Sequence, residues 1–272
     1  MDIVQSIILG LIQGATEVLP ISSSAHLLLV PLLAGWPDSG LTFDVALHFG
    51  TFIALFTYFR SDIASMLKDG LTGFWQEGKE KQLRLPWMIV LASVPAAIVG
   101  KTMEHQIEAV FRSSPMITAI MLILFGLGLG LADRFGRQVR NLGSITLGSA
   151  MFIGCFQCLA LMPGVSRSGI TITAALILGL ARTDSARFSF LLSLPIVFGA
   201  ALLKAIHLLK HGMEPGMALP MLTGMAVAAI SGYISVAFLL KFVQSSTLWA
   251  FVWYRLLFGV IVIILVLSGV LK

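Results

Sequence analysis

The chain has 272 residues, of which 57% are hydrophobic and only 11% are charged, whereas roughly a quarter of the residues of a soluble domain are charged. This composition leaves too little polar surface to cover a water-soluble globule, so it indicates an integral membrane protein. The formal net charge of +5 does not require a nucleic-acid partner, because basic cytoplasmic loops account for it.

The apolar runs have the length of helices and are rich in Leu, Ile, Gly and Ala, which favours an all-α bundle over a β-barrel. The first run, residues 3–35, is broken by the sequence PISSSAH at 20–26. Each arm is shorter than the roughly 20 residues that a transmembrane helix needs. We therefore expect a re-entrant helical hairpin whose polar tip lies inside the membrane.

A polar loop is expected at 60–85 and a basic loop at 133–143, and residues 144–180 repeat the broken pattern around PGVSRSGIT at 163–171. Six further apolar runs are long enough for full transmembrane helices, namely Phe43–Phe59, Pro86–Lys101, Met116–Leu131, Ala186–Leu209, Met217–Leu240 and Leu248–Leu271. The pattern predicts a polytopic protein with six full spans.

The two broken stretches are related by a shift of 144 positions. The shift superimposes these residue pairs: Gly10 on Gly154, Gln13 on Gln157, Ser22 on Ser166, Ser24 on Ser168 and Gly35 on Gly179. We interpret the chain as one membrane domain, 1–272, built from two repeats, 1–132 and 144–272, each a re-entrant hairpin plus three spans. Because three crossings invert the second copy, this is an inverted repeat, which brings the two tips together near the middle of the membrane.

Loop charges predict an orientation. If residues 60–85 and 133–143 are cytoplasmic, that side carries about twice as many basic residues as the other, in line with the positive-inside rule. Both termini then face outward.

The first break carries an acid, a base and hydroxyls. Gln13 and Glu17 are four residues apart and lie on one helix face, where a carboxylate can hold a divalent cation or accept a proton. His26 can act as acid, base or nucleophile near neutral pH. The hydroxyl of Ser23 becomes a nucleophile when a base such as Glu17 or His26 takes its proton. The nucleophile stays open between Ser23, His26 and water.

The second break carries an arginine, and a charge in the middle of a bilayer is by default functional. Arg167 suits phosphate because its planar fork donates two parallel hydrogen bonds. We expect it to bind substrate together with these side chains: Gln13, Ser22, Ser166, Ser168 and Thr171. The alternative is a purely structural ion pair between Arg167 and Glu17.

Two other polar residues lie within long apolar runs. His48 can approach the site, but a packing or hydrogen-bonding role explains it at least as well. Arg255 is expected to snorkel or to pair on the cytoplasmic side.

Together the two tips resemble the undecaprenyl-diphosphate phosphatase family, also called bacitracin-resistance proteins. That family carries a (Glu/Gln)-x-x-x-Glu motif, matched by Gln13–Glu17, before a stretch that ends here at His26, and a PGxSRSxxT motif, matched in full by Pro163–Thr171. The resemblance covers essentially the whole chain. Many members have Glu where this chain has Gln13, so Glu17 must carry more of the metal-binding or basic role.

The resemblance implies hydrolysis of the C55 prenyl diphosphate to undecaprenyl phosphate and inorganic phosphate. This reaction recycles the lipid carrier for peptidoglycan synthesis and confers bacitracin resistance. The implied location is the bacterial inner membrane, with the site facing the periplasm or outside. The resemblance also implies a divalent cation, Mg²⁺ or Ca²⁺, at Glu17 and Gln13, and a possible homodimer.

A different class of function uses the same architecture. A transporter or flippase for an anionic prenyl lipid can also be built from inverted repeats with broken helices. The combination of base, hydroxyl and arginine favours hydrolysis, because transport does not require a nucleophile.

Overall fold

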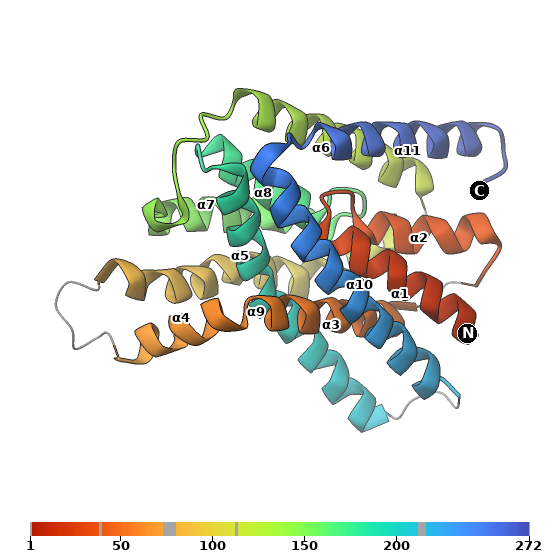
Figure 1. Ribbon diagram of the computed structural model, residues 1–272. Coiled ribbons are helices and arrows are strands. Elements are labelled where there is room, and N and C mark those ends of the chain that lie inside the picture. Colours follow the sequence, from red (N-terminus) through yellow and green to blue (C-terminus); the bar gives the residue numbers. More distant parts are fainter. Residues whose placement is uncertain (1, 38–39, 73–79, 112–113, 212–215, 272) are drawn as a thin grey trace.

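A computed structural model describes residues 2–37, 40–72, 80–111, 114–211 and 216–271. Within these ranges the chain is mainly helical (Figure 1). In chain order the helices are α1 (Ile3–Val18), α2 (Ser23–Ala34), α3 (Gly40–Tyr58), α4 (Arg60–Thr72), α5 (Glu80–Phe111), α6 (Pro115–Phe135), η2 (Leu142–Ser144), α7 (Leu147–Gln157), η3 (Cys158–Leu161), α8 (Arg167–Ile177), α9 (Arg182–His211), α10 (Ala218–Ser245) and α11 (Trp249–Leu267).

Within the described ranges, five helices are long and apolar enough to cross a membrane, namely α5, α6, α9, α10 and α11. The bent pair α3 and α4 makes a sixth if it is one span. The two broken stretches each form two shorter apolar arms, α1 with α2 and α7–η3 with α8. These findings confirm an all-α polytopic membrane protein.

The prediction of a polar loop over 60–85 is wrong. The structure has α4 in this stretch and starts α5 at Glu80 rather than at Pro86, while residues 73–79 lie outside the described part of the chain. The axis of α4 makes an angle of 71° with that of α3. Ile63 and Met66 pack against the main core, and because they are three apart they form an apolar stripe on a helix that is polar on average. Averaged hydropathy hides such a stripe.

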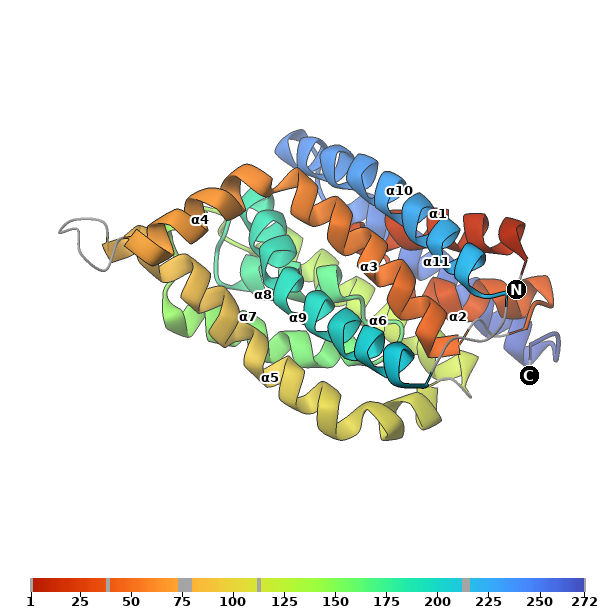
Figure 2. The same cartoon turned by 90° about the horizontal axis from the view of Figure 1, so that it is seen from below.

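The main helix pairs join the two parts of the chain before 132 and after 144. Helix α1 packs along α10, α7 along α5, and α3 along α9 and α10 (Figure 2), while α6 and α11 lie side by side (Figure 1). The backbones approach closely at glycines: a Cβ on Gly10 would lie 2.6 Å from the carbonyl oxygen of Gly224, and one on Gly154 would lie 2.1 Å from that of Ala92. Only glycine allows such packing.

Helix α8 is almost fully buried. Every residue from Ser168 to Leu176 is buried, and the largest apolar core cluster includes Ile172 and Leu176. The outer faces of the bundle carry exposed apolar side chains such as Leu257 and Ile264 on α11, as expected of a surface in contact with lipid. The first residue of α8, Arg167, therefore lies inside the bundle.

Candidate active site

The two breaks have the same backbone geometry. Ser22 and Ser166 adopt φ values of 75° and 71°, which are uncommon for residues other than glycine. Each serine caps the helix that follows, because its Oγ accepts the N–H three residues on, from Ala25 at 3.4 Å and from Gly169 at 3.1 Å. The first two N–H groups of each helix have no acceptor within the helix. Such a helix N-terminus favours an anion.

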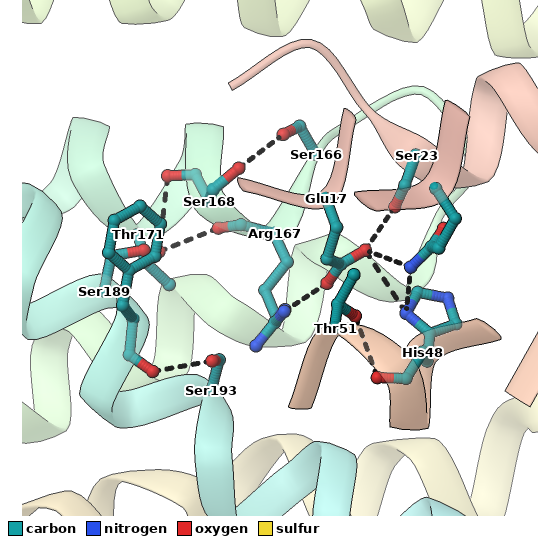
Figure 3. Close-up of polar contacts among 12 residues, drawn as sticks. Glu17, Ser23, His48, Thr51, Ser166, Arg167, Ser168, Thr171, Ser189 and Ser193 are labelled. Carbon is teal, nitrogen blue, oxygen red and sulfur yellow. Dashed lines mark hydrogen bonds and ion pairs between the residues drawn. The ribbon is translucent and has the colours of Figure 1, made fainter. Parts of the chain in front are cut away.

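Glu17 joins the two tips. Figure 3 shows its carboxylate between Ser23, the first residue of α2, and Arg167, the first residue of α8. Ser23 Oγ donates to Glu17 Oε2, and Arg167 Nη2 donates to Glu17 Oε1. The glutamate is buried. The structure thus brings together the acid, hydroxyl and arginine that the two motifs predict.

Gln13 and His48 complete the surroundings of the carboxylate. Gln13 Nε2 donates to Glu17 Oε2 at 3.2 Å and also lies 2.9 Å from His48 Nδ1. The same ring nitrogen lies 3.2 Å from Glu17 Oε2. His48 comes from α3, and its own carbonyl accepts a hydrogen bond from Thr51 Oγ1 at 2.8 Å. An ionisable residue inside a span was the sequence signal for this neighbour, but nothing in the sequence linked it to Glu17.

His26 faces other partners. Its Nδ1 lies 2.7 Å from the carbonyl oxygen of Ser22, so it donates there, and its Nε2 lies 2.7 Å from the hydroxyl of Tyr254, from which it accepts. The ring stacks on Phe258 with 4.7 Å between centroids. Both nitrogens are therefore engaged in holding the Ser22 turn against α11, and the structure does not bring His26 into contact with Glu17. Its catalytic role stays a prediction.

The serine hydroxyls at the tips are paired in the same way. Ser22 Oγ lies 3.2 Å from Ser24 Oγ, and Ser166 Oγ lies 3.3 Å from Ser168 Oγ. Ser168 Oγ also donates to the carbonyl oxygen of Leu19 at 3.3 Å, which connects the second tip to the end of the first hairpin arm. These hydroxyls line both breaks.

Thr171 is placed one turn further along α8. Its hydroxyl donates to the carbonyl oxygen of Arg167 at 2.7 Å and lies 2.6 Å from Ser189 Oγ (Figure 3). Because a hydroxyl has one proton to donate, Ser189 is the donor in the second contact. Thr171 therefore braces the first turn of α8 against α9, and its predicted contact with substrate stays a prediction.

Two buried polar atoms beside Glu17 have no hydrogen-bond partner among the described residues, namely Arg167 Nη1 and Gln13 Oε1. Leaving such an atom unpaired costs about 1–3 kcal/mol, so both point to a ligand. The guanidinium nitrogen suits a phosphate oxygen. The amide oxygen suits a hard cation.

The residues present fit a divalent cation that is shared with a phosphate. Within the described part of the chain, no group of three His, Cys, Asp or Glu side chains comes together as a metal site. Glu17 and Gln13 Oε1 supply one carboxylate and one amide oxygen. Mg²⁺ is commonly held by one or two carboxylates, with substrate phosphates and water as the remaining ligands.

Arg255 occupies a different position from the predicted one. It is fully buried and donates to four carbonyl oxygens, those of Leu122 at 3.0 Å, Pro20 at 3.3 Å, Gly164 at 2.9 Å and Val165 at 3.0 Å. The prediction that it snorkels or pairs on the cytoplasmic side is wrong. Carbonyl oxygens from the backbone of both breaks surround its guanidinium and accept its hydrogen bonds.

Comparisons with known proteins agree over the whole chain. A family model described as bacitracin resistance protein BacA matches residues 6–261. The undecaprenyl-diphosphatase of Trichlorobacter lovleyi is 72% identical over 272 residues, which is 100% of both chains. The protein of the same name from Pelobacter propionicus is 56% identical over 99% of both chains, and that from Moorella thermoacetica is 46% identical over 97% of both.

Proposed function

The chain belongs to the bacitracin resistance protein BacA family, and on this premise we propose that it is an undecaprenyl-diphosphatase of the bacterial envelope. Its relatives of that name are up to 72% identical over the full length. The reaction converts undecaprenyl diphosphate into undecaprenyl phosphate and inorganic phosphate, and so returns the lipid carrier to peptidoglycan synthesis. The observation that carries this proposal is the single carboxylate, Glu17, in contact with both a serine hydroxyl and an arginine.

The second tip and both helix N-termini hold the diphosphate. Arg167 Nη1, which is buried without a partner among the described residues, donates to an oxygen of the terminal phosphate. The unbonded amides at the starts of α2 and α8 favour the same anion, and the Ser166 hydroxyl adds a further donor. These donors stabilise the charge that develops on the phosphoryl oxygens during transfer.

Ser23 is the nucleophile that this geometry favours. Its Oγ donates to Glu17 Oε2, so Glu17 can take the proton while Oγ attacks the terminal phosphorus. The Oγ–P bond forms as the bond from phosphorus to the bridging oxygen breaks. The prenyl monophosphate leaves and receives the proton from Glu17. In the second half, Glu17 takes a proton from water, whose oxygen attacks the phosphorus while the bond from phosphorus to Ser23 Oγ breaks. Glu17 then returns the proton to Oγ, and inorganic phosphate leaves.

Direct attack by water is the competing route at the same carboxylate. Here Glu17 activates the water itself, and Ser23 only orients it. A divalent cation held by Glu17 and Gln13 Oε1 would, when bound, neutralise charge on the phosphates. Trapping of a phosphoserine separates the two routes.

The inverted repeat is supported by the ends of the short helices. Beyond the matching serine caps, Gly35 and Gly179 both have positive φ, 66° and 84°. At both, the glycine N–H bonds the carbonyl three residues back and the next N–H bonds the carbonyl five residues back, which is the Schellman ending. Ser23 and Arg167, the two partners of Glu17, are themselves 144 positions apart. We infer a duplicated half, with repeats at 1–132 and 144–272.

We also propose the inner membrane as the location, with the site open to the periplasm, and a homodimer as the assembly. The orientation rests on the loop charges, and two ion pairs agree with it because they join Arg187 and Arg182 to Asp62 and Asp133, which lie in the two stretches assigned to the cytoplasm. Arg187 Nη2 lies 2.7 Å from Asp62 Oδ1, and Arg182 Nε lies 2.5 Å from Asp133 Oδ1. Cysteine labelling from each side of intact cells tests the orientation, and crosslinking in membranes tests the dimer.

Release of phosphate from a prenyl diphosphate by the purified protein in detergent tests the function. We expect release that Glu17→Gln abolishes, because the variant cannot accept the proton. If the folded wild-type protein binds the lipid but releases no phosphate, carriage of an anionic prenyl lipid replaces hydrolysis as the function of this site.

A further inference from the structure

Arg255 is a buried arginine that the proposed reaction does not use. It lies in α11, far along the chain from both breaks, and its relative exposure is 0%. Four of its five N–H groups are bonded to carbonyl oxygens. A side chain this long and this fully bonded has a fixed position.

The carbonyl partners of Arg255 come from three segments, two of which are the breaks that form the site. Pro20 belongs to the first break, Gly164 and Val165 belong to the second, and Leu122 lies in α6. Arg255 thus bonds the backbone of both breaks through one side chain. It adds to the two other links between the tips, from Ser168 Oγ to the carbonyl oxygen of Leu19 and from Arg167 to Glu17.

Arg255 also lies directly behind the first turn of α8. A Cβ built on Gly169 would be 2.8 Å from Arg255 Nη1, so a side chain at this position would push the guanidinium away from its carbonyl partners. Gly169 is the third residue of α8, and its N–H is bonded to the Ser166 cap. The positive charge of Arg255 is thus next to the helix N-terminus that favours an anion.

The charges at the two tips do not cancel. Arg167 and Glu17 form an ion pair, whereas no described carboxylate forms one with Arg255. The carbonyl dipoles bonded to the guanidinium solvate it, but they leave its full positive charge in a buried region of low dielectric constant. An anion bound at the tips would be the counter-charge.

We propose that Arg255 is a positioning residue that ties the two tips together and supplies the fixed positive charge that favours a diphosphate over a monophosphate. This role rests on the proposed function of the site. The more highly charged substrate gains more from the buried cation than the product does, so the same charge that holds prenyl diphosphate allows prenyl monophosphate to leave.

The test compares the binding of two probes, a farnesyl methylenediphosphonate, whose P–C–P bridge cannot be hydrolysed, and farnesyl monophosphate. We expect the wild-type protein to bind the diphosphonate more tightly. Arg255→Gln removes the charge and should weaken diphosphonate binding by about tenfold or more, as loss of a buried charge does, and monophosphate binding by less. Arg255→Lys keeps the charge and should preserve the preference, with a lower unfolding temperature.

Asp133→Asn is the matched control for stability. Asp133 is also buried and bonded, to Arg182 Nε at 2.5 Å and to the N–H of Leu248 at 3.1 Å. It lies eleven residues beyond Leu122 on the same helix, or about 16 Å along the axis. This variant should lower the unfolding temperature without changing the ratio of the two dissociation constants.

Three results overturn the proposal: a wild-type protein that does not prefer the diphosphonate, an Arg255→Gln variant with an unchanged ratio, or an Arg255→Lys variant that loses the preference. If Arg255→Gln does not fold, the wild-type ratio and the Arg255→Lys ratio can still overturn the proposal. If the wild-type protein prefers the diphosphonate and Arg255→Gln loses that preference, but the wild-type protein releases no phosphate from prenyl diphosphate, the proposed function fails while the role of Arg255 stands.

Discussion

The break at 20–26 and the break at 163–171 have the same backbone conformation but different functional side chains. Both have a serine with positive φ that caps the next helix. At matching positions, however, the first has Ser23 and the second Arg167, and the position of Glu17 corresponds to Leu161. A symmetric site would place like charges face to face. One carboxylate in contact with both tips avoids this repulsion and lets one half activate a nucleophile while the other binds phosphate.

The largest effect is expected from the second tip. Arg167→Gln removes both the partner of Glu17 and the phosphate donor, and because an arginine at a transferring phosphoryl group contributes about 10³–10⁵ in kcat, we expect a loss of at least about 10³-fold. Phosphate release under saturating prenyl diphosphate measures it. Arg187→Gln is the control, since its ion pair with Asp62 is half exposed, and it should stay near wild type. Similar losses in both variants would contradict a special role for Arg167.

Ser23→Ala tests the first tip in the same assay. If Ser23 is the nucleophile, turnover should fall by about 10³-fold, in the range seen when a covalent catalyst is lost. Rapid acid quenching with substrate labelled in the terminal phosphate should trap label on the wild-type chain and none on the variant. Ser24→Ala, one residue along, should trap label normally. Near-normal turnover by Ser23→Ala would leave water as the nucleophile.

Removal of divalent cations tests whether Glu17 and Gln13 at the first tip also bind a metal ion. Dialysis against EDTA should lower phosphate release by about 10²-fold, because the charge on the phosphates is then neutralised only by the protein. Added Mg²⁺ or Ca²⁺ should restore it, and Gln13→Ala should raise the cation concentration required for half of full activity. Full activity in EDTA would show that Glu17 works only as a base.

The smallest effects are expected from substitution of the two histidines, His48 in turnover and His26 in stability. His48→Gln changes a neighbour of the Glu17 carboxylate, so turnover should fall by about tenfold. This is less than the roughly 10²–10⁴-fold contributed by a group that itself transfers the proton. His26→Gln removes a hydrogen bond to the Ser22 turn or to Tyr254 and should cost about 1–2 kcal/mol of stability, seen as a lower unfolding temperature. If His26→Gln lost more turnover than His48→Gln without any loss of stability, His26 would have a catalytic role.

Hydropathy could predict the helices because it depends on local sequence. The contact between Glu17 and Arg167, which are 150 positions apart, could be predicted only because the two motifs mark the matching breaks of a repeat. Runs of lipid-spanning length predict α5, α6, α9, α10 and α11, and the broken runs predict the short helices. The Glu17–Arg167 contact was anticipated as an alternative role for the arginine. Helix α4 was not predicted, because only two apolar side chains in a polar stretch pack it against the core.

What the sequence could not predict depends on partners far apart in the chain. Arg255 bonds Pro20 across 235 positions, and no local pattern separates such a residue from one that snorkels. The ring of His26 is fixed by Tyr254 and Phe258 on α11, although its motif lies beside Ser23. His48 reaches Glu17 only because α1 and α3 pack together.

The packing of α1 along α10 has a consequence for biogenesis. About two hundred residues separate these helices, so α1 leaves the ribosome roughly 10–40 s before its partner at 5–20 residues per second. During that time the first hairpin has neither the glycine-lined groove of α10 nor Arg255 to hold its tip. The catalytic centre therefore matures only after the last helix has entered the membrane, and a nascent chain that stops before α11 carries every motif residue but no assembled site.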